Sequence, residues 1–243
     1  TWDDDAKACY ALTLKIIQKA MDWFAAETAG KTIFGGAVAQ SLDADARRAV
    51  AARLMPAIRG MISADHRMVG HFDDQPAVLE FVNSAKLKPL AALGTSCPDH
   101  FLRTKICPLV VGFDPAKPDV DATLASLAGQ VAEYRQGYAA YYERCKHPNS
   151  PPLRDPNAVV YLVPGVGMLT FAKDKATARI SGEFYVNAIN VMRGADTVSE
   201  YCGLPEQEAF DIEYWLLEEA KLSRMPKRSE ERRVGKECLR LCR

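Results

Sequence analysis

The sequence predicts a mixed α/β fold in which a mixed sheet is flanked by helices. The first observation is a pair of apolar runs, AVVYLV and MLTF, that flank the turn PGVG at residues 164–167 and have the pattern of a β-hairpin. The second is that several longer segments, more numerous than the strands, carry apolar residues at helical spacing. With 243 residues, 48% hydrophobic and 26% charged, the chain can bury a core as one large domain or two small ones.

Two amphipathic helices are expected in the N-terminal part of the chain. Asp3 and Asp4 stand where a helix cap is expected, and the apolar residues after them share one helical face. That face consists of Leu12, Ile16, Ala20, Trp23 and Phe24. We therefore expect the first helix to face the core. A second helix is predicted from about Ser41, with Pro56 as a kink.

The middle of the chain predicts two edge strands. Residues 66–72 alternate roughly in polarity, which favours an edge strand, and Pro76 opens a short helix that reaches about Val82. The apolar run at residues 106–111 predicts another strand, which Pro108 places at an edge or an early strand position.

Three further helices follow. The long one starts at Asp121, and its apolar stripe is typical of core packing. The stripe consists of Leu124, Leu127, Val131, Tyr134, Tyr138 and Tyr141. A helix is predicted from about Asp174 to Arg193, and another from Glu206 to about Leu222.

One short motif occurs twice in front of a predicted helix. Thr1-Trp2-x-x-Asp5 recurs as Thr170-Phe171-x-x-Asp174, at an offset of 169 residues. Either chance or an internal duplication can produce so short a match, and both readings stay open.

Charge and composition exclude several classes of protein. Formal net charge is zero, which argues against nucleic-acid and membrane-surface partners. Residues 228–243 hold six basic and three acidic residues, but their beginning, RSEERRVGKEC, corresponds to the translation of a string resembling a common sequencing-library adapter. We expect this tail to be an artefact. With seven dispersed cysteines and no signal-peptide pattern, the sequence predicts a cytoplasmic protein.

Candidate chemistry is concentrated in the loop at residues 97–105. There Asp99 could orient His100 as a general acid or base, while Arg103 and Lys105 could bind a phosphate or carboxylate. The alternative, equally open, is that Asp99 caps a turn, His100 is a hydrogen-bonded structural residue and the two cations are solvated. The four dispersed histidines predict no metal site, and the turn at residues 164–167 lacks the helix that a nucleotide-binding glycine loop requires.

Three stretches resemble a known family. They are CPDHFLRTK from residue 97, VVYLVPGVGMLTFAKDKATARISGEFYVNAINVM from residue 159 and LPEQEAFDIEYWLLEEAKL from residue 204. Together they resemble the bifunctional rhamnulose-phosphate aldolase and short-chain alcohol dehydrogenase family, in register from Thr1 to about Lys227. That family joins a class II aldolase (adducin-like) region to a C-terminal Rossmann dehydrogenase.

The resemblance implies a partial class II aldolase-like α/β/α architecture within a carbohydrate-catabolic enzyme. Such an enzyme would cleave L-rhamnulose 1-phosphate to dihydroxyacetone phosphate and L-lactaldehyde, and would oxidise the lactaldehyde with NAD. The family's zinc ligands would fall before Thr1, and its NAD-binding turn would fall after Lys227. Zinc and NAD are therefore implied for the parent protein but not for residues present here, and we expect this internal fragment to be inactive alone.

The expected organisation has three parts. Residues 1–92 would end a first aldolase-like unit and add a helical connector, residues 93–227 would form a second aldolase-like α/β segment, and residues 228–243 would be the adapter-derived tail. The expected ligand is a small-molecule sugar phosphate. Two alternatives stay open, namely a non-catalytic packing or homo-oligomerisation module and a standalone phosphate-binding enzyme that uses the loop at residues 97–105.

Overall fold

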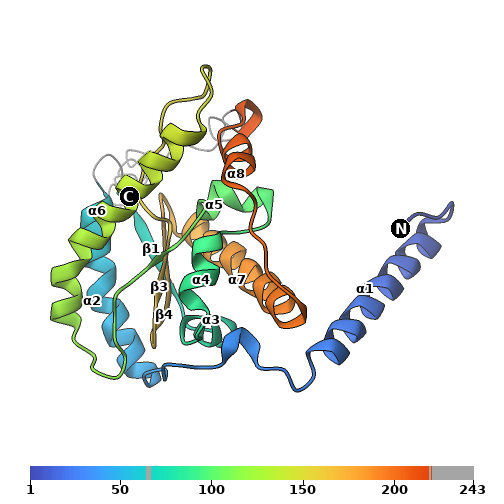
Figure 1. The fold of residues 1–243 in the computed structure, drawn as a ribbon, viewed down its shortest axis with the longest axis horizontal. Coiled ribbons are helices and arrows are strands. Elements are labelled where there is room, and N and C mark those ends of the chain that lie inside the picture. The colour runs from blue at the N-terminus through green and yellow to red at the C-terminus, as the bar shows by residue number, and fades with distance from the viewer. Residues whose placement is uncertain (64–66, 219, 221–243) are drawn as a thin grey trace, which may run out of the picture.

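A computed structural model describes residues 1–63, 67–218 and 220 (Figure 1). Its strands are β1 (Val69–Asp73), β2 (Leu109–Val110), β3 (Val160–Val163) and β4 (Gly167–Ala172). Its helices are α1 (Ala6–Thr28), α2 (Ala44–Ile62), α3 (Pro76–Val82), α4 (Leu87–Leu93), α5 (Phe101–Thr104), α6 (Val120–Cys145), α7 (Lys175–Val198) and α8 (Glu206–Glu213). Short 3₁₀ helices cover Ile33–Gly35 and Pro98–His100.

The four described strands form one mixed sheet in the order β1-β4-β3-β2. The predicted hairpin is confirmed, because β3 and β4 pair antiparallel from Val160↔Thr170 to Val163↔Gly167. Its turn needs glycine, since Gly165 has φ +73° and a Cβ there would collide with Pro115. Strand β1 pairs antiparallel with β4, whereas β2 pairs parallel with β3. Both predicted edge strands thus lie at the edges of the sheet.

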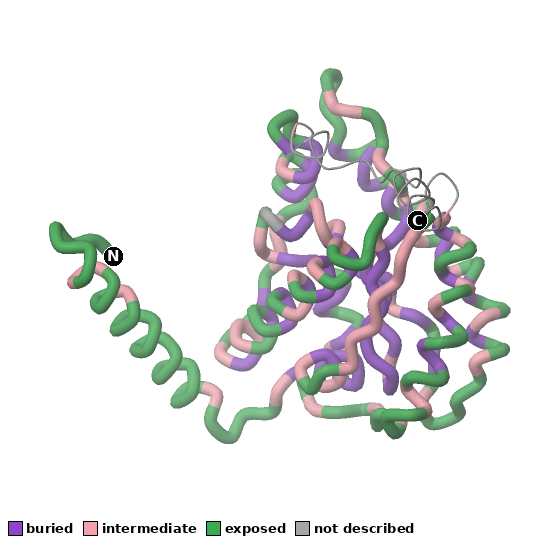
Figure 2. Tube along the Cα trace, turned by 180° about the vertical axis from the view of Figure 1, so that it is seen from behind, coloured by how far each residue is buried: buried purple, intermediate pink, exposed green. Residues whose placement is uncertain are grey.

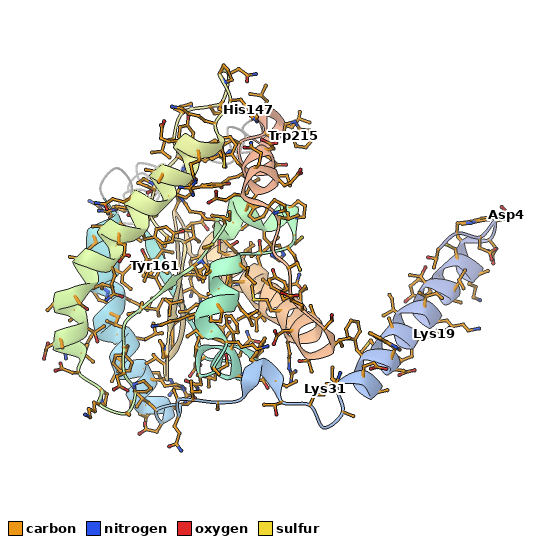
Figure 3. The ribbon with its side chains drawn as sticks, viewed as in Figure 1. Asp4, Lys19, Lys31, His147, Tyr161 and Trp215 are labelled. Atoms are coloured by element: carbon orange, nitrogen blue, oxygen red, sulfur yellow. The ribbon has the colours of Figure 1, made fainter. Side chains whose placement is uncertain are left out.

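Helices cover both faces of the sheet, as the mixed α/β prediction requires. Helices α2 and α6 lie on one face, and α3, α4 and α7 lie on the other (Figures 1 and 2). Side chains alternate along each strand, so β3 sends Tyr161 toward α2 and α6 and sends Val160 and Leu162 toward α3, α4 and α7. Tyr161 lies deep between these layers (Figure 3). The sheet and its two helical layers therefore enclose two hydrophobic clusters.

Helix α1 has a different environment from the one its sequence predicts. It contains no buried residue and extends away from the rest of the domain (Figures 1 and 2). The prediction of a core-facing helix is therefore wrong for the described structure. The physical reason is that both faces of the sheet are already covered, so that α1 meets α7 only near its C-terminal end, where Phe24 approaches Gly194.

The repeated motif of the sequence has a structural counterpart. Asp5 caps α1 by accepting the backbone N–H groups of Lys7 and Ala8, and Asp174 caps α7 by accepting that of Thr177. Near the other end of each helix a threonine hydroxyl donates to the carbonyl four residues earlier, Thr28 to Phe24 and Thr197 to Arg193. These features again lie 169 residues apart. They extend the match between α1 and α7 beyond the short motif.

The same offset also relates the apolar face of α1 to the buried face of α7. The residues Leu12, Ile16, Ala20 and Trp23 correspond to Ser181, Tyr185, Ile189 and Met192, all of which are buried against the domain. Helix α1 thus carries the pattern of a helix that covers a sheet, which explains why its sequence predicts a core position.

The remaining predictions concern boundaries. Helix α3 spans the predicted residues, α2 continues through Pro56 to Ile62, and α8 ends at Glu213, earlier than predicted. Strand β1 precedes the expected domain boundary at residue 93 and pairs with β4 beyond it, and the division itself stays a prediction.

The tail at residues 228–243 lies outside the described residues. No helix within the described ranges is both long and apolar enough to cross a membrane.

Candidate functional site

The loop at residues 97–105 folds into a 3₁₀ turn and the short helix α5, between α4 and β2. His100 is 2% exposed, and its ring packs edge-on against Phe184 of α7 with 5.1 Å between the ring centroids. Arg103 lies half-buried in the last turn of α5, and the side chain of Asp99 is outside what the structure describes. The catalytic roles proposed for Asp99 and His100 stay predictions.

Lys105 lines a cavity together with Phe101 and Leu102 of the same loop. It ends α5 with φ +61° and ψ 179°, in the left-handed region that a residue with a Cβ rarely adopts. Its Nζ donates a hydrogen bond to the carbonyl oxygen of Asp155 and lies 3.6 Å from the centroid of the Tyr138 ring. The Lys105 side chain is therefore held at the cavity by two contacts, and its role in binding an anion stays a prediction.

The cavity has a volume of about 230 Å³ and lies where the start of β1, the end of α2, α5 and the loop before β3 come together. Its lining is largely apolar and includes three cationic and two acidic residues. The charged residues are Lys105, Arg154, Lys173, Asp155 and Glu213. Arg103 does not belong to this lining. The structure thus brings Lys105 together with charged residues that are distant in sequence.

Glu213, at the end of α8, is the acidic centre of this region. It is 1% exposed, and its carboxylate accepts hydrogen bonds from the hydroxyls of Tyr138 at 2.6 Å and Tyr141 at 3.3 Å. The Tyr138 hydroxyl also lies 2.9 Å from that of Tyr214. The interpretation of the tyrosine stripe on α6 as core packing is confirmed for Tyr138 and Tyr141, and their hydroxyls add a buried polar network.

Sequence analysis missed Glu213 and Arg154. The available signal was the stripe itself, because buried tyrosine hydroxyls require partners and these partners had to come from elsewhere in the chain. Nothing in the spacing indicated that α8 would supply the carboxylate. Arg154, in the proline-rich loop, lies with its guanidinium carbon 4.9 Å from the centroid of the Tyr214 ring.

Burial perturbs the ionisation of both Lys105 and Glu213. It lowers the pKa of Lys105 to about 8, and the nearby positive charge of Arg154 acts in the same direction, while Glu213 and Asp155 partly offset the effect. Burial also raises the pKa of Glu213 above its ordinary value, against the opposing effects of Lys105 and Tyr138. The site therefore favours an amine that loses its proton readily beside a carboxyl group that holds one longer than usual.

The fold and this site can be compared with known proteins. The family described as "Aldolase class II, second domain" matches residues 49–222. The chain belongs to this family. The chain is also 35% identical, over 230 residues, to a Bacillus subtilis (strain 168) protein named "Uncharacterized oxidoreductase YuxG". That alignment covers 95% of this chain but only 33% of the relative, so the chain spans about a third of the relative's length. No solved structure matches the chain.

The family resemblance implies zinc and NAD for the longer protein, and the described residues of this chain can be tested for a binding site for either group. Within the described ranges, no three His, Cys, Asp or Glu side chains lie close enough together to hold a metal ion. The glycine turn at residues 164–167 joins two strands and opens no helix, so it does not form a dinucleotide-binding loop. The described side chains therefore form no complete zinc site by themselves, and this turn offers no site for NAD.

Proposed function

We propose that this domain works in a cytoplasmic enzyme of carbohydrate catabolism that cleaves L-rhamnulose 1-phosphate to dihydroxyacetone phosphate and L-lactaldehyde and oxidises the lactaldehyde. Three observations support the proposal. The chain belongs to a class II aldolase family, a relative is named as an oxidoreductase, and three stretches of the sequence resemble the bifunctional enzymes. In this proposal zinc and NAD are bound by other parts of a longer protein, and the chain alone has no turnover.

The observation that carries the domain's own role is the group of cationic residues that line the cavity. A sugar phosphate brings a dianionic group, and Lys105, Arg154 and Lys173 are the types of side chain that bind phosphate oxygens. Of the two acidic residues, Glu213 has a raised pKa, and the Asp155 carboxylate already accepts two N–H groups of Asn157, at 2.9 and 2.6 Å. We infer that the domain contributes phosphate binding.

A direct binding experiment tests this role. Titration calorimetry of the chain with L-rhamnulose 1-phosphate should give saturable binding, and Arg154→Met should weaken it by on the order of tenfold, as expected for one lost charge-assisted contact. Arg103→Met is the matched control, because Arg103 is a nearby arginine outside the cavity lining. Equal effects of the two substitutions, or no binding by the unaltered chain, would reject the cavity as the phosphate site.

A test in the longer protein addresses the reaction itself. With zinc and NAD added, the full-length protein should release dihydroxyacetone phosphate from L-rhamnulose 1-phosphate and form NADH, while the 243-residue chain should do neither. Turnover by the chain alone would contradict the proposed division of labour.

A further inference from the structure

We propose that the cavity selects its phosphate ligand by an apolar end. It accepts a phosphate ester whose carbon chain ends in a methyl or short alkyl group, and it discriminates against an ester with hydroxyl groups at that end. The inference deepens the proposed function and rests on it, because it takes the same cavity as the phosphate site. It adds the chemical class of the ligand and names Met68 as a residue that determines it.

The first support is the apolar wall of the cavity. Phe101 of α5, Phe171 of β4 and Ile62 at the end of α2 line it, and they are 1%, 2% and 3% exposed, respectively. Met68, just before β1, and Leu102 of α5 add two half-buried side chains. Because these residues come from separate packed elements, the wall is a fixed part of the domain. An alkyl group placed against it leaves water without losing a hydrogen bond.

The second support is that three polar side chains of the lining already have partners within the protein. The Glu213 carboxylate accepts hydrogen bonds from two tyrosine hydroxyls of α6. Oδ1 of Asp155 accepts two N–H groups of Asn157, and Oδ1 of Asn157 accepts the Nε–H of Arg135 at 2.7 Å. A ligand hydroxyl placed here would give up its bonds to water and compete with bonds that the protein already makes.

The third support is that the cationic and apolar parts of the lining share one small space. Phe101 begins α5 and Lys105 follows its last residue, and both line the cavity. The volume of about 230 Å³ is below the roughly 300–1,000 Å³ typical of sites for drug-sized ligands. A phosphate bound by Lys105, Arg154 and Lys173 therefore has the apolar wall as the neighbour of its carbon chain. L-Rhamnulose 1-phosphate fits this description, since it carries a phosphate at one end and a methyl group at the other.

Titration calorimetry of the chain with two three-carbon esters tests the inference. n-Propyl phosphate and sn-glycerol 3-phosphate carry the same phosphate group and differ by two hydroxyls. n-Propyl phosphate should bind more tightly by on the order of tenfold, because the apolar wall accepts its alkyl end. Equal affinities, or tighter binding of glycerol 3-phosphate, would overturn the inference and leave the cavity as a phosphate site. Binding of neither ester would also overturn it, and the titration with L-rhamnulose 1-phosphate then decides whether the phosphate site fails as well.

Substitutions locate the selectivity. Met68→Gln replaces an apolar lining side chain by a polar one of similar length, and it should lower the ratio of the two affinities by about fourfold, as expected for the loss of one methylene-sized apolar contact. Met21→Gln is the matched control, because Met21 is 60% exposed on α1, and it should keep the ratio. Arg154→Met should weaken the binding of both esters alike. An unchanged ratio in Met68→Gln would contradict the role assigned to Met68. If this variant does not fold, the two esters compared on the unaltered chain decide the question alone.

Discussion

The hydroxyl of Tyr138 lies 2.6 Å from Oε1 of Glu213 and joins the long helix α6 to α8 across 75 positions of sequence. Both residues are buried, so the carboxyl group depends on protein donors instead of water. The bond also fixes the ring on which the Lys105 ammonium rests. One contact therefore supports both the packing of α8 and the geometry of the cavity.

Replacing Tyr138 by phenylalanine should destabilise the domain. The buried Glu213 carboxyl would lose its shortest hydrogen bond, at a cost of about 1–3 kcal/mol in the free energy of unfolding. Urea denaturation followed by fluorescence measures this change. Tyr10→Phe is the matched control, because Tyr10 is 66% exposed on α1, and it should be neutral within error. A neutral Tyr138→Phe would show that the contact contributes little.

Lys105 should give stability a specific pH dependence. Its pKa in the folded protein is about 8, below the ordinary 10.5 that applies on unfolding. Between these values the unfolded chain binds a proton that the folded chain lacks. The free energy of unfolding therefore increases as the pH rises from about 8 toward 10.5. The unfolding free energy of the unaltered chain minus that of Lys105→Met should therefore increase from pH 8 to pH 10. A flat difference would contradict the lowered pKa.

The two capping aspartates should behave differently despite their matching positions. Asp174→Ala removes the cap of a helix that packs on the sheet and should cost about 1 kcal/mol of global stability. Asp5→Ala removes the equivalent cap of α1, which buries no residue, and should leave the main unfolding transition unchanged. Chemical denaturation of both variants makes the comparison. Equal losses would indicate that α1 unfolds together with the core.

Tyr185 should tolerate the loss of its hydroxyl. The side chain is 1% exposed, and within the described part of the chain its hydroxyl has no hydrogen-bond partner. Tyr185→Phe should thus raise the free energy of unfolding by roughly 1 kcal/mol, since an unpaired buried polar group is removed. Tyr142→Phe should have the opposite sign, because the Tyr142 hydroxyl donates to the carbonyl oxygen of Pro151 at 2.7 Å. Thermal denaturation distinguishes the two signs.

The parts of the fold that could be predicted from sequence depend on local patterns. The turn at residues 164–167 fixes the β3–β4 hairpin, and Pro76 marks the first residue of α3. Long-range relationships left no such signal. The parallel pairing of Leu109 with Tyr161 joins residues 52 positions apart, and only tertiary packing brings them together.

The same limit applies to the candidate site, because its residues come from distant parts of the chain. Lys105 draws attention because cations are concentrated in one loop, and its binding role stays a prediction. Arg154 and Glu213, which line the same cavity, lie 49 and 108 residues further along the chain. The helical spacing of apolar residues likewise predicts a buried position for α1, which the structure does not show. Periodicity identifies the face of a helix that could be buried, and the surface that would bury it is not a property of the helix.

The exposure of α1 has a consequence for how the molecule melts. Helix α1 has 23 residues, buries none of them and contacts the domain only near its C-terminal end, so it lacks most of the tertiary packing that usually stabilises a helix in a protein. Helix α1 should therefore lose its structure over a broad, low temperature range while the sheet domain remains intact. Circular dichroism of the chain would record two events, a gradual loss of helical signal and then a cooperative one, and only the second reports the stability of the domain.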